Sequence, residues 1–326
     1  MPRQLLDACC QWLVDQRFHL RGEGRRPVGD LNSTRRGTVV AAFGRHYEIE
    51  LGDGTTATGY PRGKKSIYTC GDEISLSDDG QILSLYPRRT LLYRADGFRE
   101  KLIASNVTQI ILVVATQPSF SDALLTRALV AAEHEGMQAL IVLNKCDLQD
   151  GLAAARALLA PYVALGYRVI EMCAKQDVSE LQARLQDQVS VLVGQSGMGK
   201  STLTNALIPG ALAATREVSV ALDSGKHTTT HARLYRLPVG ADGTPSNKAA
   251  LIDCPGLQEF GLSHLTPAQI GYGFLEFRSL LGQCRFRDCQ HRTEPGCAIK
   301  DAIASRHVHP RRLEHFHQLV AALGKS

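Results

Sequence analysis

The chain has 326 residues, of which 44% are hydrophobic and 21% are charged, and its formal net charge is +5. This is the composition of a globular protein of about two domains. Its longest aliphatic run, residues 110–115, is far shorter than the roughly 20 residues of a membrane-spanning helix, which excludes such a helix. Polar residues at positions 7, 11 and 15 argue against a secretory signal, and nine cysteines argue against a disulfide framework. We therefore expect a cytoplasmic protein that contacts no membrane.

The positive charge gathers at the two ends of the chain. Residues 1–37 carry seven arginines against four acidic residues, and residues 271–326 carry nine basic residues against five acidic ones. Basic ends around a near-neutral middle favour a polyanionic partner such as nucleic acid, although solvated surface charge would give the same counts. Within the first end, residues 1–20 can form a short helix, and we expect residues 1–36 as a whole to be a flexible basic extension.

Short alternating β patterns separated by turn residues fill the next segment, residues 37–92. Five strands are predicted, at 38–43, 46–51, 55–61, 73–77 and 81–86. Five strands in about 50 residues indicate a small barrel on the scale of an OB-fold, whose sheet commonly binds oligonucleotides. An SH3-like barrel without a ligand fits the same composition.

After an expected basic linker at 88–101, the pattern changes to buried strands alternating with helices, which predicts a doubly wound, mostly parallel sheet in a domain spanning 93–266. One amphipathic helix begins after Ser121 and ends at Gly136. The strands are expected at 110–115, 139–143, 168–172, 190–193, 232–237 and 249–252. Beyond them lies a helical unit, 267–326, with helices at 267–281, 298–305 and 310–323.

A glycine-rich loop follows the strand expected at 190–193. It fits the phosphate-loop pattern G-x-x-x-x-G-K-S/T in the strand–loop–helix context that the pattern requires. Glycines let backbone N–H groups approach phosphates, Lys200 would neutralise β- and γ-phosphate charge, and the Ser201 hydroxyl would bind magnesium. We predict that a nucleotide contacts Gly194, Gln195, Ser196, Gly197, Met198, Gly199, Lys200, Ser201 and Thr202.

Two further loops at strand ends indicate that this nucleotide is guanine. The first loop holds Asn144, Lys145 and Asp147, an N-K-x-D pattern whose aspartate can accept both guanine N1–H and the guanine 2-amino group. The second loop resembles the S-A-K triplet whose backbone N–H contacts guanine O6, and it consists of Cys173, Ala174 and Lys175.

A fourth pattern, D-x-x-G, follows the strand expected at 249–252. In it Asp253 would hold magnesium through water, and the Gly256 N–H would sense the γ-phosphate. Between this pattern and the phosphate loop lie three consecutive threonines at 228–230, and we expect Thr230 to bind magnesium from a mobile switch. Four such patterns at strand ends predict a GTPase.

The order of these patterns is unusual. The guanine-recognition loops come before the phosphate loop, whereas in an ordinary GTPase they come after it. The sequence therefore predicts a circularly permuted GTPase, because a permutation moves the chain ends and leaves the site in place. In this order the segment after Gly256 runs directly into the helical unit.

The helical unit carries a compact set of metal ligands. Three cysteines and one histidine lie within 14 residues, and zinc suits three sulfurs with one nitrogen. A full set of protein ligands indicates one structural zinc ion, while buried free cysteines are the alternative. The expected ligands are Cys284, Cys289, His291 and Cys297.

Together these features resemble the RsgA (YjeQ) family of circularly permuted, ribosome-dependent GTPases, over residues 37–326. The resemblance implies a factor for late maturation of the small ribosomal subunit, which binds the subunit through rRNA as a monomer and hydrolyses GTP in order to leave it. The motif of residues 225–230 adds to the resemblance, and it implies that His227 replaces the usual catalytic glutamine, whose place holds Leu257. The alternative is that His227 is an ordinary surface residue.

The expected catalytic residues are thus His227, Lys200 and Thr230, with hydrolysis slow alone and stimulated by the small subunit. Two other functions remain open at this point. A non-enzymatic, nucleotide-gated RNA-binding scaffold would share every motif except effective catalysis. A metabolic phosphoryl-transfer enzyme would need a small-molecule pocket and would not need Asp147.

Overall fold

The structure is a computed structural model that describes residues 34–63, 67–96, 99–211, 232–238, 245–254 and 260–323. The chain divides into two compact units, residues 1–89 and 90–326. The predicted N-terminal helix lies outside the described residues. Within the described ranges, no helix has the length and apolar character needed to cross a membrane.

The first unit is an antiparallel sheet with the strand order β3-β2-β1-β4-β5. Alternate residues of these strands point into one apolar core, in which Tyr47, Ile49 and Ile74 are fully buried. An isolated bridge between Tyr60 and Gln81 joins the two edge strands β3 and β5. The five predicted strands are confirmed: β1 (Arg35–Ala42), β2 (Tyr47–Leu51), β3 (Thr56–Gly59), β4 (Glu73–Leu76) and β5 (Ile82–Leu85).

The second unit begins with an antiparallel hairpin of β6 (Leu91–Asp96) and β7 (Arg99–Ser105). The expectation of a linker at 88–101 was therefore wrong over most of that range. The charged residues in this segment suggested solvated chain, but Leu92 and Ile103 are buried and anchor the hairpin. Their burial depends on contacts distant in sequence, which the local pattern does not show.

The hairpin leads into a six-stranded sheet with the order β10-β9-β8-β11-β13-β12, parallel except for β12 against β13. The central strand β8 is buried at every position because helices cover the sheet. All six predicted strands are present: β8 (Gln109–Ala115), β9 (Gln138–Asn144), β10 (Arg168–Glu171), β11 (Val189–Val193), β12 (Arg233–Pro238) and β13 (Pro245–Asp253).

The order of these strands reverses between β8 and β11, because the chain continues from β8 to β9 on one side and resumes with β11 on the other. In parallel sheets ligands bind at the carboxyl ends of the strands beside such a reversal. The helices that follow the strands are α2 (Asp122–Glu135), α3 (Leu152–Ala164), α4 (Ser179–Arg184) and α5 (Lys200–Leu207).

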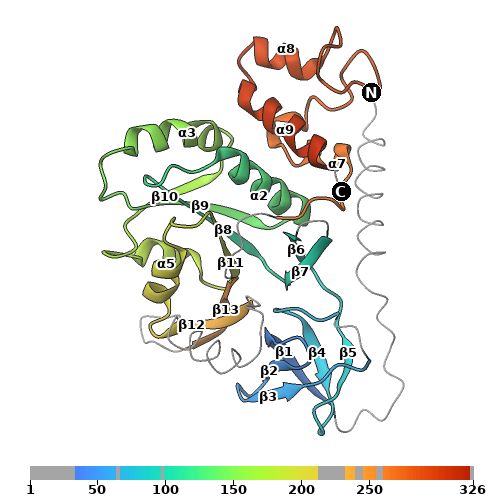
Figure 1. Cartoon of the computed structure of the whole chain (residues 1–326), viewed down its shortest axis with the longest axis vertical. Helices are drawn as coiled ribbons and strands as arrows, with labels where there is room; N and C mark the ends of the chain where they lie inside the picture. Colours follow the sequence, from blue (N-terminus) through green and yellow to red (C-terminus); the bar gives the residue numbers. More distant parts are fainter. Residues whose placement is uncertain are drawn as a thin grey trace. The chain divides into compact units, whose positions relative to one another are not determined.

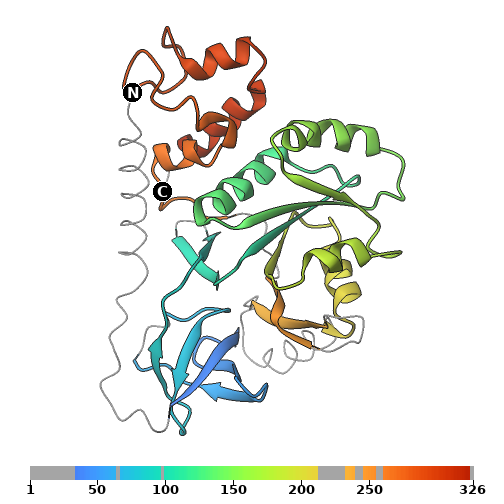
Figure 2. The ribbon, with the colours of Figure 1, turned by 180° about the vertical axis from the view of Figure 1, so that it is seen from behind.

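Helix α2 lies between this sheet and the C-terminal helices (Figures 1 and 2). It begins at the N-cap Ser121 and ends at Gly136, which has the left-handed φ of 68° typical of a helix C-cap, so the predicted bounds are confirmed. The C-terminal helices are α7 (Pro267–Tyr272), the 3-10 helix η2 (Leu275–Phe277), α8 (Ala298–Ala304) and α9 (Pro310–Leu323).

The prediction of a single helix at 267–281 was wrong. Helix α7 ends after Tyr272, and Phe274 takes an extended conformation before η2 begins. A Cβ on Gly273 would lie 2.8 Å from Val130 of α2, so the chain turns where it passes closest to that helix. The turn lets Phe274 and Phe277 stack at 4.8 Å in the core of the helical region.

Candidate nucleotide site and candidate metal centre

The loop of residues 194–199 joins β11 to α5 at the strand-order reversal. Two of its glycines have no room for a side chain. A Cβ on Gly194 would lie 2.2 Å from the Val113 carbonyl oxygen, and one on Gly199 would lie 2.3 Å from the Asn144 amide nitrogen. The loop therefore lies directly against the ends of β8 and β9, where only glycine fits.

Lys200, the first residue of α5, folds back over this loop. Its ammonium group donates to the carbonyl oxygens of Gly194 and, at 2.9 Å, of Gln195. Burial lowers the pKa of Lys200 and raises the pKa of Asp253 at the end of β13, while the opposite charge of each partner opposes the shift. The predicted phosphate-binding lysine and the predicted magnesium-holding aspartate thus share one partly desolvated space.

Asn144, the last residue of β9, is buried and bridges three loops. Its amide nitrogen donates to the Met198 carbonyl oxygen at 2.9 Å, and its amide oxygen accepts from the Ala174 N–H at 3.0 Å. The side chain therefore joins the phosphate loop to the loop after β10. We predicted Asn144 as a nucleotide-binding residue, and the structure gives it a positioning role between backbone groups.

The loop after β9 is shaped by its own backbone. Lys145 has a left-handed φ of 62°, and its ammonium group donates to the Gln117 carbonyl oxygen at 2.8 Å. The N–H of Cys146 donates to the Met172 carbonyl oxygen at 3.1 Å, which holds this loop beside the loop after β10. Asp147, the residue predicted to recognise guanine, is exposed.

The remaining residues predicted for the nucleotide fall into two groups. Met198 is buried beneath the phosphate loop. The exposed residues are Ser196 and Gly197 of the same loop, Ser201 and Thr202 of α5, and Lys175, while Cys173 is half-buried. His227, Thr230 and Gly256 lie outside the described residues, as do the other residues of the 225–230 motif.

One contact of the phosphate loop was missed by sequence reasoning. The Gln195 side-chain oxygen accepts from the backbone N–H of Ser121 at 2.7 Å. Ser121 is the N-cap of α2, and its hydroxyl accepts from the Leu124 N–H. Sequence gives the N-cap by its helix-start signal, but nothing in the pattern pairs it with a loop 74 residues away.

The predicted metal ligands Cys284, Cys289, His291 and Cys297 come together in the C-terminal region, with all four ligand atoms within 4.8 Å of one another. The His291 Nδ1 lies 3.4–3.5 Å from each of the three sulfurs. A tetrahedral zinc ion with its usual bond lengths places sulfur and nitrogen about 3.5 Å apart, so the donor set fits such an ion. Burial lowers the pKa of His291, which favours the neutral imidazole that binds metal.

Glu294 holds the turn that carries His291, another role that sequence reasoning missed. Its carboxylate accepts backbone N–H groups of Gln290 at 2.9 Å, Arg292 at 2.8 Å and Thr293 at 3.0 Å. These hydrogen bonds lower the pKa of Glu294 to about 2, so the group is charged at neutral pH. His291 itself has a left-handed φ of 61°, a conformation that needs such support.

The chain is similar to known proteins over most of its length. A family described as "RsgA GTPase" matches residues 85–263. A protein of Nitrosospira multiformis named "Small ribosomal subunit biogenesis GTPase RsgA" is 47% identical, over 93% of this chain and 95% of its own length. A protein of Paraburkholderia xenovorans with the same name is 50% identical, over 89% and 94%.

Two solved structures share the fold. The crystal structure of YjeQ from Thermotoga maritima has a TM-score of 0.69 at 29% identity and covers 89% of this chain and 98% of its own. The structure of YloQ, described as a circularly permuted GTPase, has a TM-score of 0.64 at 26% identity and covers 92% and 98%. The order of the loops along this chain is the order that permutation produces.

Proposed function

Since this chain belongs to the RsgA GTPase family, as its motifs predicted, we propose that it hydrolyses GTP in the biogenesis of the small ribosomal subunit. The curated relatives with 47% and 50% identity are named for that role. The observation that carries the proposal is the bridge made by Asn144, because it joins the phosphate loop and both guanine-recognition loops into one site.

In this proposal each loop of the site has one task. Asp147 accepts the two guanine donors, and backbone N–H groups of residues 194–199 with Lys200 hold the phosphates. Ser201 and Thr230 bind the magnesium ion of the nucleotide, and Asp253 holds it through water. The partial burial of Lys200 and Asp253 supports this arrangement, because a charge acts more strongly where water is excluded.

Hydrolysis itself is assigned to His227, Lys200 and Thr230, with Gly256 as the sensor of the γ-phosphate. His227 orients the attacking water in place of the usual glutamine, and the Gly256 N–H contacts the γ-phosphate. A site without that glutamine hydrolyses GTP slowly, so we infer that the small subunit accelerates the reaction by positioning His227 against the attacking water.

Binding of the subunit is assigned to the segments on either side of the GTPase domain. We propose that residues 37–92 form an OB-fold-like barrel and that residues 267–326 act as a zinc-binding unit beside the GTPase domain at 93–266, both contacting rRNA. The closure of the first sheet by Tyr60 and Gln81 supports the barrel, and the Cys3His geometry supports zinc. The protein acts as a monomer in the cytoplasm.

Nucleotide selectivity tests this function. Asp147→Asn exchanges a carboxylate acceptor for an amide that can also donate, so GTP should bind about 2–4 kcal/mol more weakly. Xanthine carries a carbonyl in place of the 2-amino group of guanine, so xanthosine triphosphate should bind the variant more tightly than GTP. Titration calorimetry with GTP, ATP and xanthosine triphosphate measures both effects, and Asp150→Asn in the same loop is the control.

Wild-type protein that binds ATP as tightly as GTP would contradict the assignment. Single-turnover hydrolysis with and without isolated small subunits then separates a GTPase from a nucleotide-gated scaffold. A GTPase hydrolyses faster on the subunit, whereas a scaffold leaves GTP intact in both reactions.

A further inference from the structure

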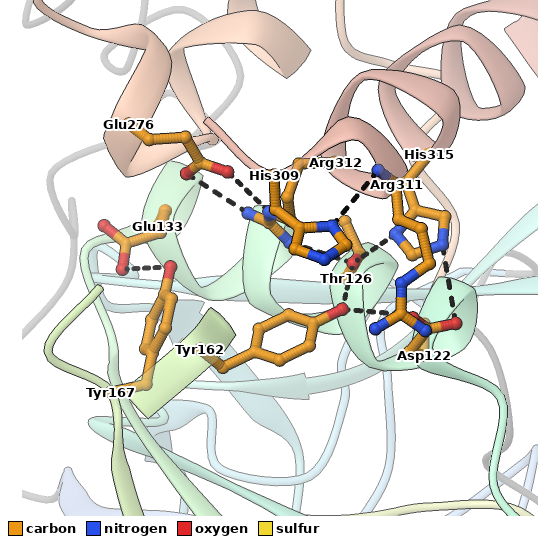
Figure 3. A network of polar contacts seen from close by, with 10 residues as sticks. All are labelled: Asp122, Thr126, Glu133, Tyr162, Tyr167, Glu276, His309, Arg311, Arg312 and His315. Carbon is orange, nitrogen blue, oxygen red and sulfur yellow. Dashed lines mark hydrogen bonds and ion pairs between the residues drawn. The ribbon is translucent and has the colours of Figure 1, made fainter. Parts of the chain in front are cut away.

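The phosphate loop and the C-terminal helices contact consecutive residues at the start of α2. Gln195 of the loop accepts from the Ser121 N–H at 2.7 Å. The next residue, Asp122, forms an ion pair with Arg311 at 3.1 Å, and its carboxylate lies 3.5 Å from Nε2 of His315, both residues of α9 (Figure 3). The first turn of α2 is therefore held from the nucleotide site on one side and from the C-terminal region on the other.

The contact between α9 and α2 is built around Arg312, whose position is fixed by a buried ion pair with Glu276 of η2. Arg312 of α9 is only 2% exposed and donates to both carboxylate oxygens of Glu276, while it also donates to the Thr126 hydroxyl at 2.9 Å. Its guanidinium lies over the rings of Tyr162 and Phe274, with centroids at 5.1 and 4.6 Å. A buried pair with this many partners penalises any shift that separates them.

The same network reaches the first turn of α2 directly. The Tyr162 hydroxyl donates to the Asp122 carbonyl oxygen at 3.1 Å and is 2.8 Å from the Thr126 hydroxyl, which is 3.0 Å from His315 (Figure 3). A small cavity lined by Ser121, Leu124 and Gln195 lies between this turn and the phosphate loop. The turn thus has space on the side of the loop and close packing on the side of α9.

We propose that Gln195 is a positioning residue that couples nucleotide binding to the docking of α9, through the first turn of α2. A nucleotide that orders residues 194–199 fixes the Gln195 oxygen, which fixes the Ser121 N–H and with it the position of the Asp122 carboxylate. Linkage makes the effect reciprocal, so docking of α9 also raises nucleotide affinity. The inference rests on the proposed function only in taking the ligand of the loop to be a guanine nucleotide.

A double-mutant cycle on the full-length protein tests the coupling, with GDP as the probe and calorimetry as the measurement. Asp122→Asn should weaken GDP binding between about twofold and about thirtyfold, the usual range for a residue that acts through such a network. In the Gln195→Ala background the same substitution should have no further effect. Asp301→Asn and Gln182→Ala, both at exposed positions, are the matched controls and should bind GDP as the wild type does.

Arg311→Ala removes the same ion pair from the side of α9 and should weaken GDP binding as Asp122→Asn does. Because Arg311 lies outside α2, agreement between the two variants shows that a folding defect in α2 is not the cause. Hydrogen exchange gives the reciprocal readout: GDP should increase protection of residues 310–323 in the wild type and should not do so in Gln195→Ala at saturating GDP.

The coupling would be overturned if Asp122→Asn weakened GDP binding by the same factor in the wild type and in the Gln195→Ala background. Equal GDP affinity in all variants would also overturn it. Both results would leave the proposed function intact. Wild-type protein that does not bind GDP would instead overturn the proposed function.

Discussion

At the scale of single residues, the site is organised by side chains that bind backbone groups. Asn144 is buried, and its side-chain amide donates to the Met198 carbonyl oxygen and accepts from the Ala174 N–H. Gln195 likewise uses its oxygen on the Ser121 N–H. Both are polar residues of a nucleotide-binding motif, and both act by fixing where the neighbouring loops lie.

We expect Asn144→Ala to destabilise the protein by about 2–4 kcal/mol, because it leaves a buried carbonyl and a buried N–H without their partners. Affinity for GTP and GDP should fall together, while the preference for guanine over xanthine should stay unchanged because Asp147 is intact. Urea unfolding and calorimetry measure the two effects. Asn205→Ala, at an exposed position of α5, is the control, and a change of base preference in Asn144→Ala would contradict the positioning role.

At the scale of elements, a charged side chain can hold a short loop in one conformation by binding its backbone N–H groups. The segment that carries His291 has no regular hydrogen-bonding pattern of its own, and the Glu294 carboxylate accepts three of its N–H groups instead. Since the folded pKa of Glu294 lies at about 2, below its ordinary value of 4.5, this contribution is fully present above pH 4.5 and is lost as the pH falls through about 2.

We expect Glu294→Ala to weaken zinc binding about tenfold or more at neutral pH, because the loop that presents His291 must then be ordered by the metal alone. Competition with a chelator, monitored on the full-length protein, measures the affinity. Asp288→Ala removes an exposed acidic residue from the same loop and serves as the control. If both variants held zinc equally well, Glu294 would have no role in forming the site. GTP binding should stay largely unchanged in both.

At the scale of the whole molecule, basic segments lie at both ends of a chain whose middle carries the nucleotide site. In the permuted order, about ten residues separate Gly256 from the start of α7 at Pro267. If the Gly256 N–H contacts the γ-phosphate, as proposed, a change there would reach the C-terminal region through a short covalent connection. Attachment by two separated contacts depends on both being engaged at once, so moving one of them weakens the whole attachment.

We expect the small ribosomal subunit to bind this protein about tenfold or more tightly with a non-hydrolysable GTP analogue than with GDP, which is within the usual range of coupling between sites. Binding should weaken as salt is raised, because contacts with rRNA phosphates release counterions. Sedimentation with purified subunits at two salt concentrations measures both dependences. Equal affinity in the two nucleotide states would rule out the switch, even in a protein that hydrolyses GTP.

The sequence alone determined the features that local patterns carry. The loops around Asp147, Gly194 and Asp253 are recognisable because each combines a short motif with the strand before it. The cluster of Cys284, Cys289, His291 and Cys297 is recognisable because its members lie within 14 residues, so chain connectivity already holds them close. The family membership followed from the order of these motifs.

Only the tertiary structure decided which distant groups meet. Ser121 and Gln195 are 74 residues apart, and Thr126 and Arg312 are 186 residues apart. Hydrogen bonds and ion pairs of this kind leave no periodic signal, because any polar side chain at an element's surface fits the pattern equally well. The hairpin of β6 and β7 and the early end of α7 were also decided by the tertiary structure. In both, packing against distant residues outweighed the structure that the local sequence favoured.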